Sequence, residues 1–291
     1  MQTHLASWIQ ESDFQDIAKN GFNSVRVPVG YWNVISDPHK RFVPGDVRVS
    51  LSYLDWVFAM CAKYSLSVLL DLHGAPGSQN GVDHSGCGMA PDWLESKTNT
   101  DLTIEAIEAM MQRYGHHEVL LGMELVNEPA IEYCRAPLLP RLKDFYRRAY
   151  HTVRKHSRTA MVVFNELFEE CYAVWKDELQ EPTYYNVVMD LHLYNWQEPY
   201  TSEPAAQHIQ DAVAFAEVVQ AQSVHHPVIV GEWCFSTGTV VQAGQPFVDA
   251  CVESFRSGLG WYLWNWKVER GIHFDEWDVQ LQYEKVDGLR V

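Results

Sequence analysis

The chain lacks the features that mark several classes of protein. It has no apolar run of about 18 residues, the length of a membrane-spanning helix, so we expect no membrane span. Its first residues, MQTHLASWIQ, are neither basic nor followed by an apolar core, so we expect no signal peptide. Basic residues are scarce, and 22 of them against 38 acidic residues give a formal net charge of −16. This charge disfavours nucleic acid and anionic membranes as partners and suits a neutral or cationic substrate.

The six cysteines are scattered and form no Cys-x-x-Cys pair. Cys61 and Cys251 lie in helical patterns, where a buried free thiol is the usual state. Cys87 and Cys134 fall in predicted loops, where pairing is open to them. We expect free thiols, and this cysteine usage does not decide the compartment.

Linkers, low-complexity runs and charge blocks are also missing from the 291 residues, of which 47% are hydrophobic. We therefore expect one domain over residues 1–291.

Short apolar runs alternate with segments of helical period. The strands we predict are Ser24–Val29, Ser67–Leu72, Val119–Val126, Ala160–Phe164, Asn186–His192, Pro227–Glu232 and Gly260–Trp266. The helices we predict cover residues 11–20, 51–64, 100–114, 137–156, 169–178, 205–222 and 246–257. Strands that are apolar throughout and are each followed by a helix indicate a parallel sheet buried on both faces. Repeated over this length they predict a (β/α)₈ TIM barrel, with a doubly wound open sheet as the alternative.

The ends of the predicted strands separate these two folds. No glycine-rich phosphate loop follows any strand, whereas a doubly wound nucleotide-binding sheet carries one. Polar or aromatic residues recur instead at the carboxyl ends of the strands, where barrel enzymes keep their catalytic residues. These residues are His73, Asn127, Glu128, His192, Tyr194, Glu232 and Trp264, and a further polar residue, Arg26, lies inside the apolar strand Ser24–Val29.

Glu128 and Glu232 each end an apolar strand, and each has a characteristic neighbour, Asn127 or Trp233. Paired carboxyl groups at a cleft are what glycoside hydrolysis uses: one protonates the leaving oxygen, and the other attacks the sugar or activates water. The alternative is that each glutamate is a surface loop residue or a helix-cap partner. Two such glutamates at strand ends favour catalysis.

The remaining strand-end residues each have a structural alternative. Arg26 either forms a core ion pair with Glu124 or holds Glu232 ionised, because a nearby guanidinium favours a carboxylate. Histidines at strand ends are either buried hydrogen-bonding groups or contacts for sugar hydroxyls and carboxylates; His73 and His192 are the two cases. The hydroxyl of Tyr194 either packs or donates to the nucleophile, and Trp264 is either core or a sugar-stacking platform.

Two Asp-x-His pairs, Asp71 with His73 and Asp190 with His192, place possible metal ligands on strand faces. Metal sites need three or four ligands in a tight set, and these pairs lie on strands distant in sequence. We expect no metal and no cofactor.

Taken together and in order, these residues resemble family-5 glycoside hydrolases of clan A. That family has an arginine, a histidine, an Asn-Glu pair, a His-x-Tyr, a second glutamate and a tryptophan. The loop HGAPGSQNG, together with GFNSVRVPVGYW and WNWKVE, is similar to the exo-β-1,3-glucanase branch. The resemblance covers residues 11–290.

The resemblance implies a retaining mechanism in which Glu128 is the acid/base and Glu232 the nucleophile. It implies that Asn127 holds the sugar 2-hydroxyl and that an oligo- or polysaccharide, most specifically a β-1,3-glucan, is the substrate. The branch carries phenylalanines at two acceptor-side positions where this chain differs. Val82 and then His84 follow the GSQNG loop, and Trp196 stands near the other position, so we place His84 and Trp196 among the substrate-binding residues.

The family opens with a strand and a GVNLGGW-like turn, whereas this chain starts at the following helix. We therefore expect a barrel of seven strands, N-terminally incomplete relative to the family, in which residues 1–10 form no strand. The family resemblance suggests secretion if the N-terminus is incomplete, and we expect a monomer. The alternatives to a β-1,3-glucan hydrolase are an endo-acting β-1,4-glucanase, a glycolipid β-glucosidase, or a glycan-binding barrel without turnover.

Overall fold

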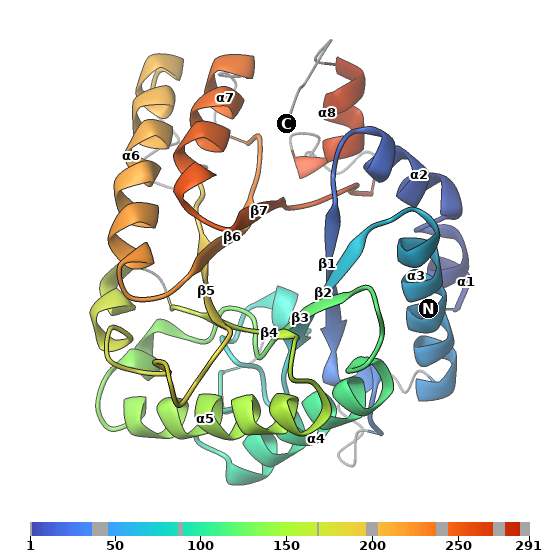
Figure 1. The fold of residues 1–291 in the computed structure, drawn as a ribbon, viewed down its shortest axis with the longest axis vertical. Coiled ribbons are helices and arrows are strands. Elements are labelled where there is room, and N and C mark those ends of the chain that lie inside the picture. Colours follow the sequence, from blue (N-terminus) through green and yellow to red (C-terminus); the bar gives the residue numbers. More distant parts are fainter. Residues whose placement is uncertain are drawn as a thin grey trace. The chain divides into compact units, whose positions relative to one another are not determined.

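The computed structural model describes residues 2–36, 46–86, 90–167, 169–195, 203–236, 244–269 and 277–285. The chain folds as two compact units, Met1–Val187 and Val188–Val291 (Figure 1). None of the helices within the described ranges is long and apolar enough to cross a membrane.

Within the described residues, seven strands follow one another in chain order in one sheet, and the strands paired within each unit run parallel. They are β1 (Ser24–Gly30), β2 (Ser67–Gly74), β3 (Leu120–Glu124), β4 (Met161–Asn165), β5 (Val187–His192), β6 (Val228–Trp233) and β7 (Gly260–Leu263). A doubly wound sheet would reverse its strand order at a switch point, and this order does not reverse. The predicted (β/α)-barrel class with seven strands is confirmed, and the doubly wound alternative is excluded.

The first unit carries five α-helices and four short 3₁₀ turns among its described residues. The α-helices are α1 (Gln2–Ser7), α2 (Glu11–Lys19), α3 (Val47–Lys63), α4 (Lys97–Tyr114) and α5 (Leu139–His156). The 3₁₀ turns are η1 (Tyr31–Asn33), η2 (Asp83–Ser85), η3 (Ile131–Cys134) and η4 (Glu169–Val174). Capping side chains begin two of the helices: Asp46 accepts from the backbone of Arg48, and Ser96 accepts from that of Asn99. Helices α4 and α5 pack against each other (Figure 1).

The second unit carries α6 (Ala205–Ser223), α7 (Gly244–Ser254), η6 (Phe255–Ser257) and α8 (Val279–Lys285). Helices α6 and α7 lie side by side (Figure 1). Strands β5 and β6 are buried along their whole length, which explains why their sequences are apolar without alternation.

The N-terminal residues and several boundaries differ in detail from the predictions. Residues 2–10 contain the helix α1 rather than a strand, as predicted for this segment. The predicted strands Val119–Val126 and Gly260–Trp266 are shorter and end at Glu124 and Leu263, so Trp264 follows its strand rather than lying in it. The helix predicted over 169–178 is the 3₁₀ turn η4, and sequence periodicity did not reveal α1 or α8.

The cysteine prediction was wrong at two positions. Cys134, in η3, forms a disulfide with Cys171, in η4, which the sequence analysis treated as a free thiol. Cys87 lies outside the described residues. Cys61 and Cys251 are free and buried as predicted, and burial raises the pKa of the Cys61 thiol to about 12. The disulfide joins the loop after β3 to the loop after β4, a pairing that sequence spacing does not encode.

Removing the disulfide is expected to destabilise the chain. The bond closes a loop across a sequence separation of 37 residues. In the chain-entropy account, the double variant Cys134→Ser/Cys171→Ser loses about 4 kcal/mol of unfolding free energy, measured by urea denaturation. Each single variant serves as the control, because either one removes the whole bond and should lose nearly as much as the double. An unchanged midpoint in the double variant contradicts the prediction.

Candidate active site

A buried arginine connects three strands of the first unit. The Nε of Arg26, on β1, donates to Oε2 of Glu124 at 2.7 Å, and its Nη2 donates to Oε1 of the same carboxylate at 3.1 Å. Nη2 also lies 2.8 Å from Oδ1 of Asn127 and 3.1 Å from Oδ2 of Asp71. The side chains of Arg26, Asp71 and Glu124 are 3%, 0% and 0% exposed. The predicted ion pair with Glu124 is confirmed, and the alternative contact of Arg26 with Glu232 stays a prediction.

His73 and Asn127 orient each other within this cluster. The Nδ1 of His73 lies 2.6 Å from Oδ2 of Asp71, and its Nε2 lies 3.4 Å from Nδ2 of Asn127. A proton on Nδ1 satisfies the carboxylate and leaves Nε2 as an acceptor for the amide, so these partners select that tautomer. The Asn127 amide is thus fixed at both ends, because its oxygen faces Arg26 and its nitrogen faces His73.

Two amide side chains of the loop after β2 hold the backbone around Glu128. The buried Gln79 donates through Nε2 to the carbonyl oxygens of His73, at 2.8 Å, and Asn127, at 2.9 Å. Asn80 donates to the carbonyl oxygen of Glu128 at 2.9 Å. The carbonyl groups of Asn127 and Glu128, which follow β3, are therefore bound by two neighbouring residues of one loop.

Glu128 sits in an uncommon backbone conformation. Its φ is 39°, in the left-handed region that side-chain-bearing residues seldom adopt. Such a conformation costs about 1–3 kcal/mol and persists only where the surroundings enforce it. The Glu128 side chain is 16% exposed, and its Oε2 lies 3.4 Å from Nε2 of His84, whose side chain is 34% exposed. Glu128 thus remains partly open to solvent, while its backbone is bound by the loop after β2.

Glu232 is the centre of the corresponding group in the second unit. On β6 it is in register with His192 on β5, and its carbonyl oxygen accepts from the backbone of Leu193 at 3.0 Å. The hydroxyl of Tyr194 donates to Oε2 of Glu232 at 2.7 Å, and Nδ1 of His192 lies 3.6 Å from the same oxygen. The predicted contact of Tyr194 with Glu232 is confirmed. A hydrogen bond donated to a carboxylate favours its ionised form.

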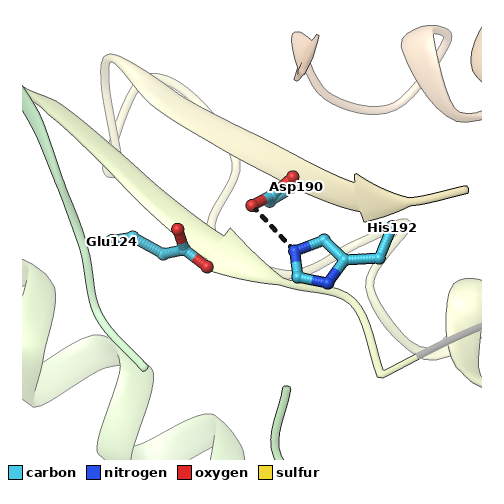
Figure 2. A group of neighbouring side chains, drawn as sticks. All are labelled: Glu124, Asp190 and His192. Atoms are coloured by element: carbon cyan, nitrogen blue, oxygen red, sulfur yellow. Dashed lines mark ion pairs between the residues drawn. The ribbon is translucent and has the colours of Figure 1, made fainter. Parts of the chain in front are cut away.

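Asp190 supports His192 from the other side of the ring. Figure 2 shows the Asp190 carboxylate facing the imidazole, with its Oδ2 3.4 Å from Nε2 of His192. The backbone N–H of Gly231 donates to Oδ1 of Asp190 at 2.5 Å. A Cβ at residue 231 would lie 2.0 Å from Oδ2 of this carboxylate, so only glycine leaves room for it.

Trp264, which follows β7, is connected to Trp233 at the end of β6. Trp264 donates its backbone N–H to the carbonyl oxygen of Trp233 at 2.8 Å. The Trp233 ring packs edge-to-face on Trp261, with their centroids 5.4 Å apart. Trp264 is half-buried, and sugar stacking on it stays a prediction. Trp196 lies outside the described residues.

In each Asp-x-His pair the aspartate carboxylate lies beside the histidine ring and has one further partner. On β2 the aspartate also bonds the guanidinium of Arg26, and on β5 it also accepts from the backbone of Gly231. The expectation that the site holds no metal stays a prediction.

Sequence reasoning missed the supporting residues. It did not single out Gln79, Asn80 or Gly231, and it weighed Asp71 and Asp190 only as metal ligands. The Asp-x-His spacing was an available signal, because residues two apart share one face of a strand.

Strand-end glutamates on a (β/α)-barrel chain, with histidine, asparagine and tyrosine around them, are the arrangement of a glycoside hydrolase. The family model Cellulase (glycosyl hydrolase family 5) matches residues 1–270. The chain belongs to glycosyl hydrolase family 5.

Named relatives fit this assignment. The chain is 29% identical to glucan 1,3-beta-glucosidase of Pichia angusta and 31% identical to that of Blumeria graminis. Each alignment covers 96% of this chain and 73% of the relative. Among solved structures, rutinosidase from Aspergillus niger matches with a TM-score of 0.80 and 19% identity, over 96% of this chain and 82% of that chain. The structural match supports the fold alone.

Adding a methyl group at residue 231 should disturb the arrangement of Asp190, His192 and Glu232. In Gly231→Ala the new Cβ would lie 2.0 Å from Oδ2 of the buried Asp190 carboxylate and must displace it. We expect kcat to fall at least about 10-fold, because a small misplacement of a site group is costly. Gly260→Ala is the matched control, since nothing lies within 4 Å of a Cβ there. Equal activity of the two variants, measured on an aryl β-glucoside, contradicts the prediction.

Removing the Tyr194 hydroxyl should change the pH dependence of the reaction. Tyr194→Phe deletes a donor to the Glu232 carboxylate, so the ionised form is less favoured and the acidic limb of the kcat/KM profile moves to higher pH. Tyr185→Phe is the control, because the recorded hydrogen bonds of Tyr185 are made by its backbone. An acidic limb that stays in place would show that this hydroxyl only packs.

Proposed function

We propose that this chain hydrolyses β-1,3-linked glucan with retention of the anomeric configuration. Membership of glycosyl hydrolase family 5 supports the reaction class, and the two relatives named glucan 1,3-beta-glucosidase support the linkage. In this proposal Glu128 is the acid/base, Glu232 is the nucleophile, and Asn127 binds the 2-hydroxyl of the sugar at the cleaved bond.

The assignment of the two roles rests on one observation: the two glutamates differ in their exposure and in the groups that contact them. Glu232 is 5% exposed and accepts the Tyr194 hydroxyl, which suits a nucleophile that must be ionised. The Glu128 side chain is more open, at 16% exposed, and its Oε2 lies 3.4 Å from Nε2 of His84. Different surroundings of two carboxyl groups are how one acts as an acid while the other stays ionised.

The proposed reaction has two steps. Glu232 attacks the anomeric carbon while Glu128 gives its proton to the departing glycosidic oxygen, which leaves a glycosyl-enzyme ester and a Glu128 carboxylate. That carboxylate then takes a proton from water as the water attacks the anomeric carbon, and Glu232 departs. Asn127 suits its role because Arg26 and His73 fix its amide before any sugar arrives.

Two variants test the roles of the glutamates. Glu232→Ala is expected to abolish hydrolysis, and added azide should restore turnover by attacking the open face and giving the α-glycosyl azide. Glu128→Ala should lose most activity on substrates with poor leaving groups, because those need the proton most. A β-configured azide product from Glu232→Ala would contradict the nucleophile assignment.

The substrate is tested by a product profile on laminarin beside a cello-oligosaccharide. Turnover confined to laminarin supports the β-1,3 linkage. Glucose as the sole product indicates exo cleavage, and a ladder of oligosaccharides indicates endo cleavage. Preference for the cello-oligosaccharide would overturn the proposed linkage, and binding without turnover would overturn the proposed activity.

A further inference from the structure

His84 belongs to a tightly braced loop of residues 75–86, which follows β2. The indole of Trp32 lies directly on three glycines: Gly30 at the end of β1, Gly74 at the end of β2 and Gly86 at the end of this loop. A Cβ at Gly30, Gly74 or Gly86 would come within 2.3, 2.5 or 2.2 Å of that ring. Such contacts leave the loop little freedom to shift relative to the ends of β1 and β2.

Internal hydrogen bonds complete the bracing. The hydroxyls of Ser78 and Ser85 lie 2.6 Å apart. The Ser78 hydroxyl also accepts from the backbone N–H of Gly81 at 2.6 Å, and that of Ser85 donates to the carbonyl oxygen of Val82 at 2.6 Å. His84 is therefore presented from a rigid support, although the tip of the loop is exposed.

The contacts of His84 converge on Glu128. The Nε2 of His84 lies 3.4 Å from Oε2 of Glu128 and 3.3 Å from Nδ2 of Asn80. The same Nδ2 group donates to the carbonyl oxygen of Glu128 at 2.9 Å. Since an amide NH₂ group only donates, its approach to Nε2 fits an imidazole whose Nε2 carries a lone pair. A lone pair facing a carboxyl oxygen is favourable when that carboxyl holds a proton.

We propose that His84 is a positioning residue for the acid/base, holding the Glu128 proton between Oε2 and Nε2 until substrate arrives. This inference rests on the proposed function of Glu128. When the glycosidic oxygen takes the proton, the carboxylate remains and His84 stays neutral, so His84 gains and loses no proton over the cycle. The sequence analysis placed His84 among the substrate-binding residues, and the inference assigns it instead an action through Glu128.

Several charged or titratable groups lie near the His84 ring within the described part of the first unit. They include Glu128, His73, whose ring centroid lies 5.7 Å away, its partner Asp71, and the neighbouring Asp83. In the proposed mechanism Glu232 also faces the reacting bond. Because such groups titrate together, the predicted quantity is a limb of the pH profile rather than the ionisation of one residue.

The experiment measures kcat/KM as a function of pH on an aryl β-glucoside. It compares the basic limb of this profile in His84→Leu and His84→Gln. Leucine removes the acceptor, so the protonated acid is less favoured and the basic limb should move to lower pH by about half to one unit, the effect of one neutral hydrogen bond. Glutamine keeps an acceptor at similar reach and should restore most of the shift. Val82→Ala, at an exposed neutral position of the same loop, is the matched control and should leave the limb in place.

Each other result overturns the proposal. A limb that moves to higher pH in His84→Leu would mean that His84 acts as a cation, and an unmoved limb would mean that it does not act through Glu128. Loss of rate without a shift of the limb would indicate a purely structural role. The variant Glu128→Gln distinguishes failure of the His84 inference from failure of the proposed function. If that variant keeps the basic limb, both the acid/base assignment and the His84 inference fail, whereas if it loses the limb and His84→Leu keeps it, the His84 inference alone fails.

Discussion

The first unit depends on how one buried guanidinium is neutralised. Arg26 cannot lose its charge inside the protein, so the surrounding strands must supply negative charge and acceptors. Asp71 and Glu124 do so from β2 and β3, which is possible because they are in register with each other. Breaking such a buried cluster costs about 3–5 kcal/mol, because the remaining charge has no partner. The same arginine binds the side-chain oxygen of Asn127, so a contact that folding requires also orients the amide proposed to bind the sugar.

The two glutamates are controlled in different ways. Glu232 lies within a buried strand, and its side chain is directed by Tyr194 and His192 on the neighbouring segment. Glu128 stands after a strand, in a backbone conformation that the loop side chains Gln79 and Asn80 hold. A strand fixes a side chain through the regular pleat, whereas a loop must fix it through individual hydrogen bonds.

Most of the framework was predictable from the sequence, because strands buried on both faces leave long apolar runs that helical segments interrupt. The candidate site residues could also be picked out from the sequence, since polar side chains at the ends of such runs stand out. The partners of those residues were not. The roles of Gln79 and Asn80 depend on how a loop folds back on the next strand, and the partner of Cys134 depends on two short turns with no periodic signal. Element ends also escaped prediction, because Leu125, Val126 and Trp264 continue the apolar pattern beyond the last residues of their strands.

The contact between Gly231 and Asp190 constrains the history of this site. As long as residue 190 carries a carboxylate, residue 231 has room only for glycine. The two positions can therefore diverge in one order only: the aspartate must be replaced first, and a side chain at residue 231 becomes tolerable afterwards. Among descendants of such a site, a larger residue at 231 should occur only where the aspartate has already been lost, so these two positions should vary together.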